Sequence, residues 1–181
     1  MNWRRLFGGK DNAAEGDYRE LALQDLQPGS LVDYDLQTWE VTAQNQYEYD
    51  GEPSPEWVLR SGDQVRFLEP STEDGRTYWT WTREIDVASI GEPVADTVAR
   101  TDDPPEEVHF EGVCYRGTES SAGLFREGGT GPEREFIVWT YEAGDRQVLF
   151  ISQWGDKDFA AYAGEYVEEY QFTNILPPAK E

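Results

Sequence analysis

The stretch Glu56–Leu68 reads EWVLRSGDQVRFL, two short runs rich in apolar residues on either side of Ser-Gly-Asp. Aromatic and β-branched residues are favoured in strands, and glycine readily adopts the positive φ angle that tight hairpin turns require. The stretch therefore predicts an antiparallel hairpin with strands at Glu56–Arg60 and Gln64–Leu68.

The second half of the chain repeats this pattern, together with residues that precede it. The matches keep their order along the chain, with small insertions at turns. They are Val32-Asp33-Tyr34-Asp35 with Val108-His109-Phe110-Glu111, Trp39 with Tyr115, Thr42 with Thr118, Glu56-Trp57-Val58-Leu59 with Glu135-Phe136-Ile137-Val138, Gly62-Asp63 with Gly144-Asp145, and Val65-Arg66-Phe67-Leu68 with Val148-Leu149-Phe150-Ile151. An ordered series of matches indicates an internal duplication, and hence two similar β units.

Short strand-forming runs separated by turn signals such as Asp50-Gly51 and Asp74-Gly75 continue along both halves. The further runs are Ser30–Tyr34, Thr38–Ala43, Gln46–Tyr49, Tyr78–Arg83, Val108–Tyr115, Ser121–Phe125, Glu135–Tyr141, Arg146–Gln153 and Val167–Phe172. In Tyr78–Arg83, tryptophans alternate with hydroxyl-bearing residues, which predicts one apolar and one polar face. This spacing of strands predicts an all-β protein of two similar antiparallel β units, arranged as a sandwich or a partly open barrel.

Two of the runs, Phe136–Trp139 and Val148–Ile151, are apolar at every position. A strand that is buried on both faces shows this pattern, so we expect both strands to be central. The aromatic residues of the most apolar runs should be largely buried, namely Trp57, Phe67, Phe136, Trp139 and Phe150.

Composition divides the chain into five segments. They are an N-terminal arm with one short helix over Tyr18–Leu26 (residues 1–26), a first β repeat (27–90), an acidic, proline-containing linker without aromatic residues (91–107), a second β repeat (108–176) and a tail (177–181). Pro28-Gly29 is a typical end for the predicted helix.

The formal net charge is −22, and the chain holds 15 Lys and Arg residues against 37 Asp and Glu. This balance disfavours binding to nucleic acid and to anionic membrane surfaces, which require basic patches. It leaves open a solvated acidic surface, such as salt adaptation produces, or an acidic face that docks a basic partner.

Location and redox state follow from the termini and the cysteine content. Cys114 is the only cysteine, so no intramolecular disulfide forms. Met1–Phe7 mixes basic and apolar residues without the long apolar core of a secretory signal, and no stretch reaches membrane-spanning length. We therefore expect a cytoplasmic protein whose membrane contact is at most through the N-terminal arm.

His109 and Cys114 are the first candidates for chemistry, because a Cys–His pair is a common nucleophilic arrangement. On one regular strand their odd spacing places them on opposite faces, unless a bulge at Gly112 changes the parity. The simpler interpretation is a packed thiol and an ordinary imidazole, and we assign the pair no catalytic role.

Two further segments lack the features of a binding motif. Gly128-Gly129-Thr130-Gly131 is glycine-rich but is followed by no Gly-Lys-Ser/Thr, so we expect a hairpin loop rather than a phosphate site. Asp102-Asp103 and Glu106-Glu107 flank two prolines without the spacing of a calcium loop. The sequence therefore assigns no catalytic, cofactor-binding or metal-ligating residue, and no cofactor.

Paired carboxylates on a β scaffold also suit a hydrolase, in which two acids flank the scissile bond. Glu56 and Glu135 occupy matching positions of the two repeats and form the candidate pair. Among 37 acidic residues such a pairing is expected by chance, and exposed strand-end carboxylates are the simpler interpretation.

Five short motifs follow one another between Leu26 and about Ile90. They are Leu26-Gln27-Pro28-Gly29, Val32-Asp33-Tyr34, Trp39-Glu40-Val41, Glu56-Trp57-Val58-Leu59 and Val65-Arg66-Phe67-Leu68. Through these motifs the run resembles the DUF4178-type bacterial domains of unknown function. Val108–Ile175 resembles the family more loosely, as a second tandem copy. The resemblance implies no known activity; it implies an accessory role linked to membrane-stress or polyamine-related systems.

Together these features predict a noncatalytic binding or accessory module whose partner is another protein. One alternative is an acidic decoy that occupies the nucleic-acid site of a basic partner. The other is a hydrolase with paired carboxylates in a cleft. The sequence names neither the ligand nor the oligomeric state.

Overall fold

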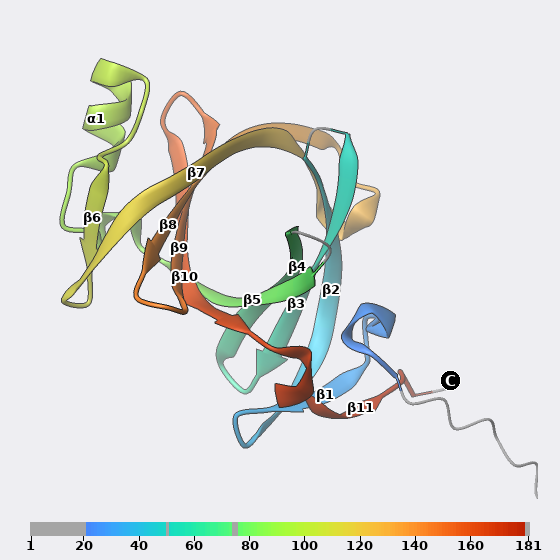
Figure 1. The fold of residues 1–181 in the computed structure, drawn as a ribbon. Coiled ribbons are helices and arrows are strands. Elements are labelled where there is room, and N and C mark those ends of the chain that lie inside the picture. Colours follow the sequence, from blue (N-terminus) through green and yellow to red (C-terminus); the bar gives the residue numbers. More distant parts are fainter. Residues whose placement is uncertain (1–20, 50, 74–75, 180–181) are drawn as a thin grey trace, which may run out of the picture.

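A computed structural model describes residues 21–49, 51–73 and 76–179 of the chain (Figure 1). These residues form one antiparallel sheet of eleven strands. The strands are β1 (Leu31–Tyr34), β2 (Gln37–Tyr49), β3 (Glu52–Ser61), β4 (Gln64–Glu73), β5 (Arg76–Ile85), β6 (Glu107–Phe110), β7 (Val113–Arg126), β8 (Glu133–Ala143), β9 (Gln147–Gly155), β10 (Asp158–Val167) and β11 (Thr173–Leu176). The helical elements are 3-10 turns η1 (Leu23–Asp25), η2 (Val87–Ser89), η3 (Glu127–Gly129) and η4 (Glu169–Gln171), and helix α1 (Val94–Thr101).

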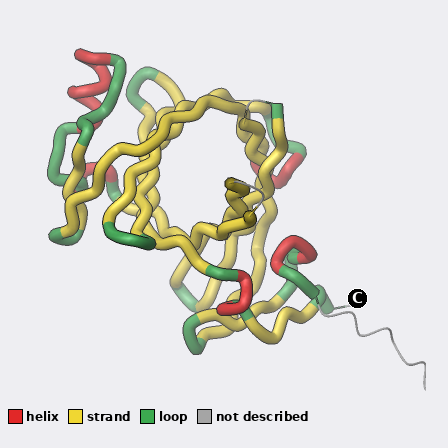
Figure 2. The backbone as a smooth tube through the Cα atoms, viewed as in Figure 1, coloured by secondary structure: helices red, strands yellow, loops and turns green. Residues whose placement is uncertain are grey.

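The sheet closes on itself because β2 pairs with β7 as well as with β3. Eight strands form a closed ring in the order β2-β3-β4-β5-β10-β9-β8-β7, and Figures 1 and 2 show it end-on. β1 and β11 extend the sheet beyond the first part of β2, and β6 extends it beyond the first part of β7. The prediction of an all-β antiparallel protein is confirmed.

Two pairings join the halves of the ring, and each contains a glycine in close contact with the opposite backbone. On β7, Gly123 lies opposite Tyr49, and a Cβ added there would overlap the carbonyl oxygen of Glu48. On β10, Gly164 lies opposite Thr82, and its Cβ would overlap the carbonyl oxygen of Trp81. The two pairings, which we call the seams, therefore depend on residues without a side chain.

The buried apolar residues form two clusters. The β1 cluster consists of Leu23, Leu26, Val32, Tyr34, Trp39, Val41, Trp57, Leu59, Leu68, Trp79, Trp81, Val167 and Phe172. The α1 cluster consists of Ile85, Ile90, Val94, Val98, Val108, Phe110, Tyr115, Trp139, Tyr141, Ala143, Leu149, Ile151, Ala161 and Ala163. The elements that cover them, β1 with β11 and α1 with β6, lie on different sides of the ring (Figure 1).

Helix α1 corrects the expected placement of helical structure. It lies within residues 91–107, the predicted linker, where Val94 and Val98 project one turn apart into the α1 cluster. The predicted N-terminal helix is wrong as described: Leu23–Asp25 is a single 3-10 turn that buries Leu23, and residues 18–20 lie outside the described chain. No described helix is long and apolar enough to cross a bilayer.

Several strands differ from those predicted. Thr38–Ala43 and Gln46–Tyr49 belong to one strand, β2, while the predicted strand Val108–Tyr115 is a hairpin that turns at Glu111-Gly112. β10 is a strand that sequence patterns missed, since its alanines and glycine have low β propensity. The predicted strand Val167–Phe172 is mainly the turn η4.

The expected core is partly wrong. Trp57, Phe136 and Trp139 are buried as predicted. Phe67 and Phe150 are only half-buried, because they face the interior of the ring instead of either apolar cluster.

The seams generate a stability prediction. We expect Gly123→Ala and Gly164→Ala each to lower the free energy of unfolding by about 1–3 kcal/mol, because the added methyl group must displace a paired backbone. Urea unfolding followed by tryptophan fluorescence measures the loss.

Gly155→Ala is the matched control, since a Cβ at this strand position meets no atom within 4 Å. Its free energy of unfolding should change by less than about 0.5 kcal/mol. Equal stabilities for all three variants would contradict the tight contact at the seams.

Candidate functional site

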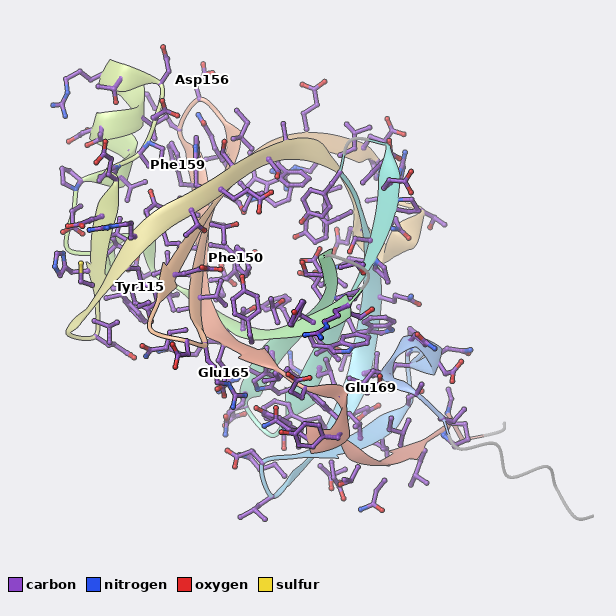
Figure 3. The ribbon with its side chains drawn as sticks, viewed as in Figure 1. Tyr115, Phe150, Asp156, Phe159, Glu165 and Glu169 are labelled. Atoms are coloured by element: carbon purple, nitrogen blue, oxygen red, sulfur yellow. The ribbon has the colours of Figure 1, made fainter. Side chains whose placement is uncertain are left out.

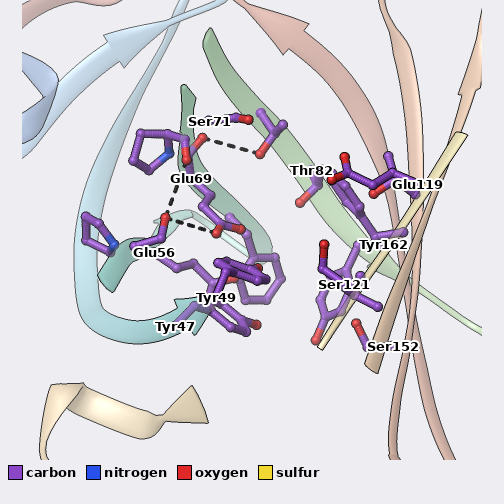
Figure 4. A pocket seen from close by; sticks show the side chains of 18 of the residues that line it. Tyr47, Tyr49, Glu56, Glu69, Ser71, Thr82, Glu119, Ser121, Ser152 and Tyr162 are labelled. Carbon is purple, nitrogen blue, oxygen red and sulfur yellow. Dashed lines mark hydrogen bonds between the residues drawn. The ribbon is translucent and has the colours of Figure 1, made fainter. Parts of the chain in front are cut away.

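A cavity of about 650 Å³ occupies the interior of the ring (Figure 4). All eight ring strands contribute residues to its lining. The volume lies within the range of small-molecule sites, roughly 300–1,000 Å³. We call this space the ring cavity.

Strand alternation explains how the sequence produces the ring cavity. On β5, Trp79 and Trp81 point into the β1 cluster, whereas Thr80 and Thr82 line the cavity. The polar face predicted for Tyr78–Arg83 is therefore the inward face. Serine and threonine at inward positions of several strands leave space that larger side chains would fill. They are Ser54, Ser71, Thr72, Thr80, Thr82, Ser121, Thr140 and Ser152.

Aromatic rings form part of the cavity wall. Tyr47 and Tyr49 stack with their ring centroids 5.7 Å apart, and Phe136 meets them edge-on at 5.3 and 5.6 Å. Phe67 and Tyr162 form a second edge-on pair with centroids 5.2 Å apart. The inward wall thus combines flat apolar surfaces with hydroxyl groups.

Two glutamates, Glu56 of β3 and Glu69 of β4, line the cavity side by side, because the register that pairs Trp57 with Leu68 makes them cross-strand neighbours. Figure 4 shows both on the same wall as Tyr47 and Tyr49. We call Glu56 and Glu69 the carboxyl pair; the structure brings them together and sequence reasoning did not.

Each member of the pair has neutral hydrogen-bond donors. Asn45 Nδ2 donates to Glu56 Oε1 at 2.8 Å, and Tyr47 also hydrogen-bonds this carboxyl group. Ser54 Oγ donates to Glu69 Oε1 at 3.2 Å, and Tyr49 hydrogen-bonds Glu69.

The loop at η3 fixes the orientation of Asn45. The backbone N–H of Gly128 donates to Asn45 Oδ1 at 3.0 Å, so the amide nitrogen is left to donate to Glu56. Gly128–Gly131, which was expected to be a hairpin loop, thus supports the cavity wall from outside.

Burial dominates the protonation of the carboxyl pair. It raises the pKa of Glu56 to about 7, opposed by the hydrogen bonds from Asn45 and Tyr47. Burial, with the nearby charge of Glu56, raises the pKa of Glu69 to about 8. Burial likewise raises the pKa values of Tyr47 and Tyr49 well above 10, so both remain neutral donors. The pair therefore keeps its protons to higher pH than exposed glutamates do, and it ionises around pH 7–8.

The candidate pair Glu56 and Glu135 does not form. Glu135 is exposed on β8, next to Phe136, which lines the cavity, so its side chain points away from the ring interior. The partner of Glu56 is Glu69. A sequence signal for it exists, because Glu69 follows Phe67 by two positions and shares its face.

His109 and Cys114 are brought closer than a single strand would allow. The turn at Glu111-Gly112 makes them direct partners across β6 and β7. His109 Nδ1 lies 2.7 Å from Glu92 Oε1, and Cys114 is exposed. Neither residue lines the ring cavity.

The acidic segment around residues 102–107 has structural contacts. Asp102 ends α1 in a left-handed conformation, and Glu107 Oε1 pairs with Arg116 at 2.7 Å. Over the described ranges, no group of three or more His, Cys, Asp or Glu side chains has the arrangement of a metal site.

Comparison with known proteins places the chain in a family. The model described as "Domain of unknown function (DUF4178)" matches residues 27–169. The chain belongs to this family. The DUF4178 match runs without a break across both expected repeats, so the family unit includes the whole ring.

A DUF4178 relative extends over nearly the whole chain. It is an uncharacterized protein of Aquifex aeolicus (strain VF5), 26% identical over 174 residues that cover 96% of each chain. No solved structure matches the chain.

The raised pKa values predict how stability depends on pH. Unfolded glutamates lose their protons near pH 4.5, whereas the folded pair retains them to about pH 7–8. The stability that these groups contribute is therefore fully present below about pH 4.5 and is lost as pH rises through 7–8.

Replacing both groups by neutral amides removes this dependence. We expect the Glu56→Gln/Glu69→Gln double variant to lose less stability than the wild-type protein between pH 5 and pH 9, measured by urea unfolding. Glu135→Gln, which changes an exposed carboxylate, should follow the wild-type curve. A double variant that also follows it would contradict the raised pKa values.

Proposed function

We propose that this DUF4178 protein is a noncatalytic binding module that takes a small molecule into the ring cavity. The observation that carries the proposal is the cavity of about 650 Å³ lined by all eight ring strands. Small barrels fill their interior with side chains or use it to hold one small ligand. Here the inward serines and threonines favour the second use.

The placement of the apolar clusters supports the same function. Both clusters use the strand face that points away from the ring cavity, together with β1, β6 and α1. The fold is therefore stabilised from outside the ring. The inner face therefore carries residues that do not belong to either apolar cluster.

A hydrolase is the second candidate, because the carboxyl pair brings two acids side by side in the wall of the ring cavity. Acid and base catalysis requires environments that push two pKa values apart. Burial raises the pKa of both Glu56 and Glu69, and both keep neutral donors. The arrangement therefore favours binding over hydrolysis.

The remaining sequence-based hypotheses concern the outside of the molecule. An acidic outer surface suits a basic protein partner, either as a docking face or as a decoy of nucleic acid. Cytoplasmic location and the link to membrane-stress or polyamine-related systems stay predictions of the same kind.

We also propose that the sheet contains two similar five-stranded units, β1–β5 and β6–β10, each of which gives four strands to the ring. Val32 lies opposite Trp39 in the first hairpin, and Val108 lies opposite Tyr115 in the hairpin β6–β7. Trp39 belongs to the β1 cluster, and Tyr115 belongs to the α1 cluster. The ordered sequence matches align the same residues, Val32 with Val108 and Trp39 with Tyr115.

A second correspondence supports the two units. Thr42 Oγ1 donates to the carbonyl oxygen of Val58 at 3.1 Å, and Thr118 Oγ1 donates to that of Thr140 at 3.3 Å. Each threonine lies at an irregularity of its strand pairing. By this correspondence Val58 and Thr140 hold equivalent positions.

Adjacent serines on β7 allow a matched test of the binding site. Ser121 lines the ring cavity, whereas Ser120 is exposed and does not. We expect a fragment screen by thermal shift to yield compounds that stabilise both the wild-type protein and Ser120→Phe. The same compounds should not stabilise Ser121→Phe, because the phenylalanine side chain obstructs the cavity. A ligand at one hundred times its Kd stabilises by about 2.7 kcal/mol.

Two results would contradict the binding function. One is a screen in which no fragment stabilises the wild-type protein. The other is a set of fragments that stabilises Ser121→Phe as strongly as Ser120→Phe, which would place their site elsewhere.

A further inference from the structure

The two walls of the ring cavity differ in charge. With Val58 and Thr140 as equivalent positions, Glu56 on β3 corresponds to Val138 on β8, two residues earlier in each strand. Val138 also lines the cavity. The same inward position thus holds a carboxyl group in one unit and a methyl-bearing side chain in the other.

Glu69, the second member of the carboxyl pair, also corresponds to a neutral residue of the other unit. Phe67 pairs with Val58, and Phe150 pairs with Thr140, so Glu69 corresponds to Ser152, two residues later in each strand. Ser152 lines the cavity as well. The wall formed by the second unit thus has neutral residues at both positions that correspond to the carboxyl pair.

Over the described residues, no side chain brings a positive charge to the carboxyl pair. The described residues that line the cavity include no lysine, arginine or histidine. Glu56 is 7% exposed, and Asn45 and Tyr47 give it hydrogen bonds but no counter-charge. A buried carboxylate without a cation is costly, so an external cation would gain a strong interaction here.

Aromatic rings adjoin the carboxyl pair. Tyr47 hydrogen-bonds Glu56, and Tyr49 hydrogen-bonds Glu69. The two aromatic rings therefore lie next to the carboxyl groups. Phe67 lines the same cavity. Aromatic faces attract ammonium groups, and a carboxylate beside them adds charge and hydrogen-bond acceptors.

We propose that the ring cavity binds an organic cation with an aromatic or aliphatic body, whose ammonium N–H groups donate to Glu56 and Glu69. The body of this ligand lies against Tyr47, Tyr49 and Phe67. This inference rests on the binding function proposed above and specifies its ligand class.

The cavity fits an organic cation better than a metal ion. Its volume of about 650 Å³ far exceeds that of a coordinated ion. In the described parts of the chain, no three carboxylate, imidazole or thiolate groups meet as ligands. Across the cavity, the hydroxyl groups of Thr82, Ser121 and Ser152 face the pair and suit a polar end of the ligand (Figure 4).

Binding should release protons. A carboxyl group that is protonated in the empty cavity gives its proton to solvent, and the resulting carboxylate pairs with the cation. The other titratable side chains lining the cavity are Tyr47 and Tyr49 of β2, Glu52 of β3, Glu119 of β7, and Tyr162 and Tyr166 of β10. Affinity for the cation should therefore rise between pH 6 and pH 8.5, as the pair ionises.

Three probes of one shape test the charge preference: phenethylamine, 2-phenylethanol and 3-phenylpropionate. The amine stays protonated up to about pH 10, as lysine does. By isothermal titration calorimetry at pH 8, we expect phenethylamine, or its hydroxylated analogue tyramine, to bind at least about tenfold more tightly than the alcohol. The carboxylate should show no binding.

Variants of the pair assign the effect to these two residues. Glu56→Gln/Glu69→Gln should weaken amine binding at least about tenfold, whereas Glu135→Gln should not change it. Glu56→Val/Glu69→Ser, which copies the residues at the corresponding positions of the other unit, is a second test and should weaken amine binding in the same way. Titrations in two buffers of different ionisation enthalpy measure the protons released on binding. Phe150, labelled inside the ring in Figure 3, lines the same cavity.

The outcomes separate the two proposals. Neutral fragments that bind in the cavity while both amines do not would overturn the cation inference and leave the binding function intact. The cation inference would also be overturned if Glu135→Gln weakened amine binding as strongly as Glu56→Gln/Glu69→Gln does. If no amine and no fragment binds, both proposals fail.

Discussion

The closure of the sheet is the constraint on which the rest of this structure depends. Two strand pairings, β2 with β7 and β5 with β10, join segments far apart in the chain. Each places a glycine against a carbonyl oxygen of the opposite strand, Gly123 in one and Gly164 in the other. Arg126 of β7 pairs across the first seam with Glu48 of β2 at 3.3 Å, and with Glu133 of the neighbouring β8 at 2.6 Å. Closure turns one face of every ring strand inward and creates the cavity.

Because the sheet closes into a ring, the two faces of its strands carry different residues. Large apolar side chains on the outer face are covered by β1, η1 and β11 on one side and by β6 and α1 on the other. The inner face carries small hydroxyl residues, aromatic rings and the carboxyl pair. Asn45 connects this wall to the η3 loop outside the ring, because its amide oxygen accepts from Gly128 while its nitrogen donates to Glu56.

Local patterns predicted the hairpins and the two faces of β5, because alternation and turn glycines act over a few residues. Ring closure was not predictable in this way, since no local signal pairs β2 with β7. β10 was missed because its alanines and its glycine have low strand propensity. These small residues are needed because β5 lies close beside them, and that requirement comes from the tertiary structure. Glu135 was paired with Glu56 by a match that differs by three residues from the correspondence with Val138 that we propose. An odd shift moves a side chain to the opposite face.

We propose that the ring interior is a binding site in which Glu56 and Glu69 pair with a cationic ligand. The measurement that tests it most directly is a titration of the side-chain carboxyl ¹³C signals of Glu56 and Glu69 by NMR, with and without tyramine. The account predicts that burial places the pKa of Glu56 at about 7 and that of Glu69 at about 8 in the free protein. Both should titrate at lower pH when tyramine is bound. Signals that titrate near the ordinary glutamate pKa of 4.5 in the free protein, or that do not respond to tyramine, would contradict it.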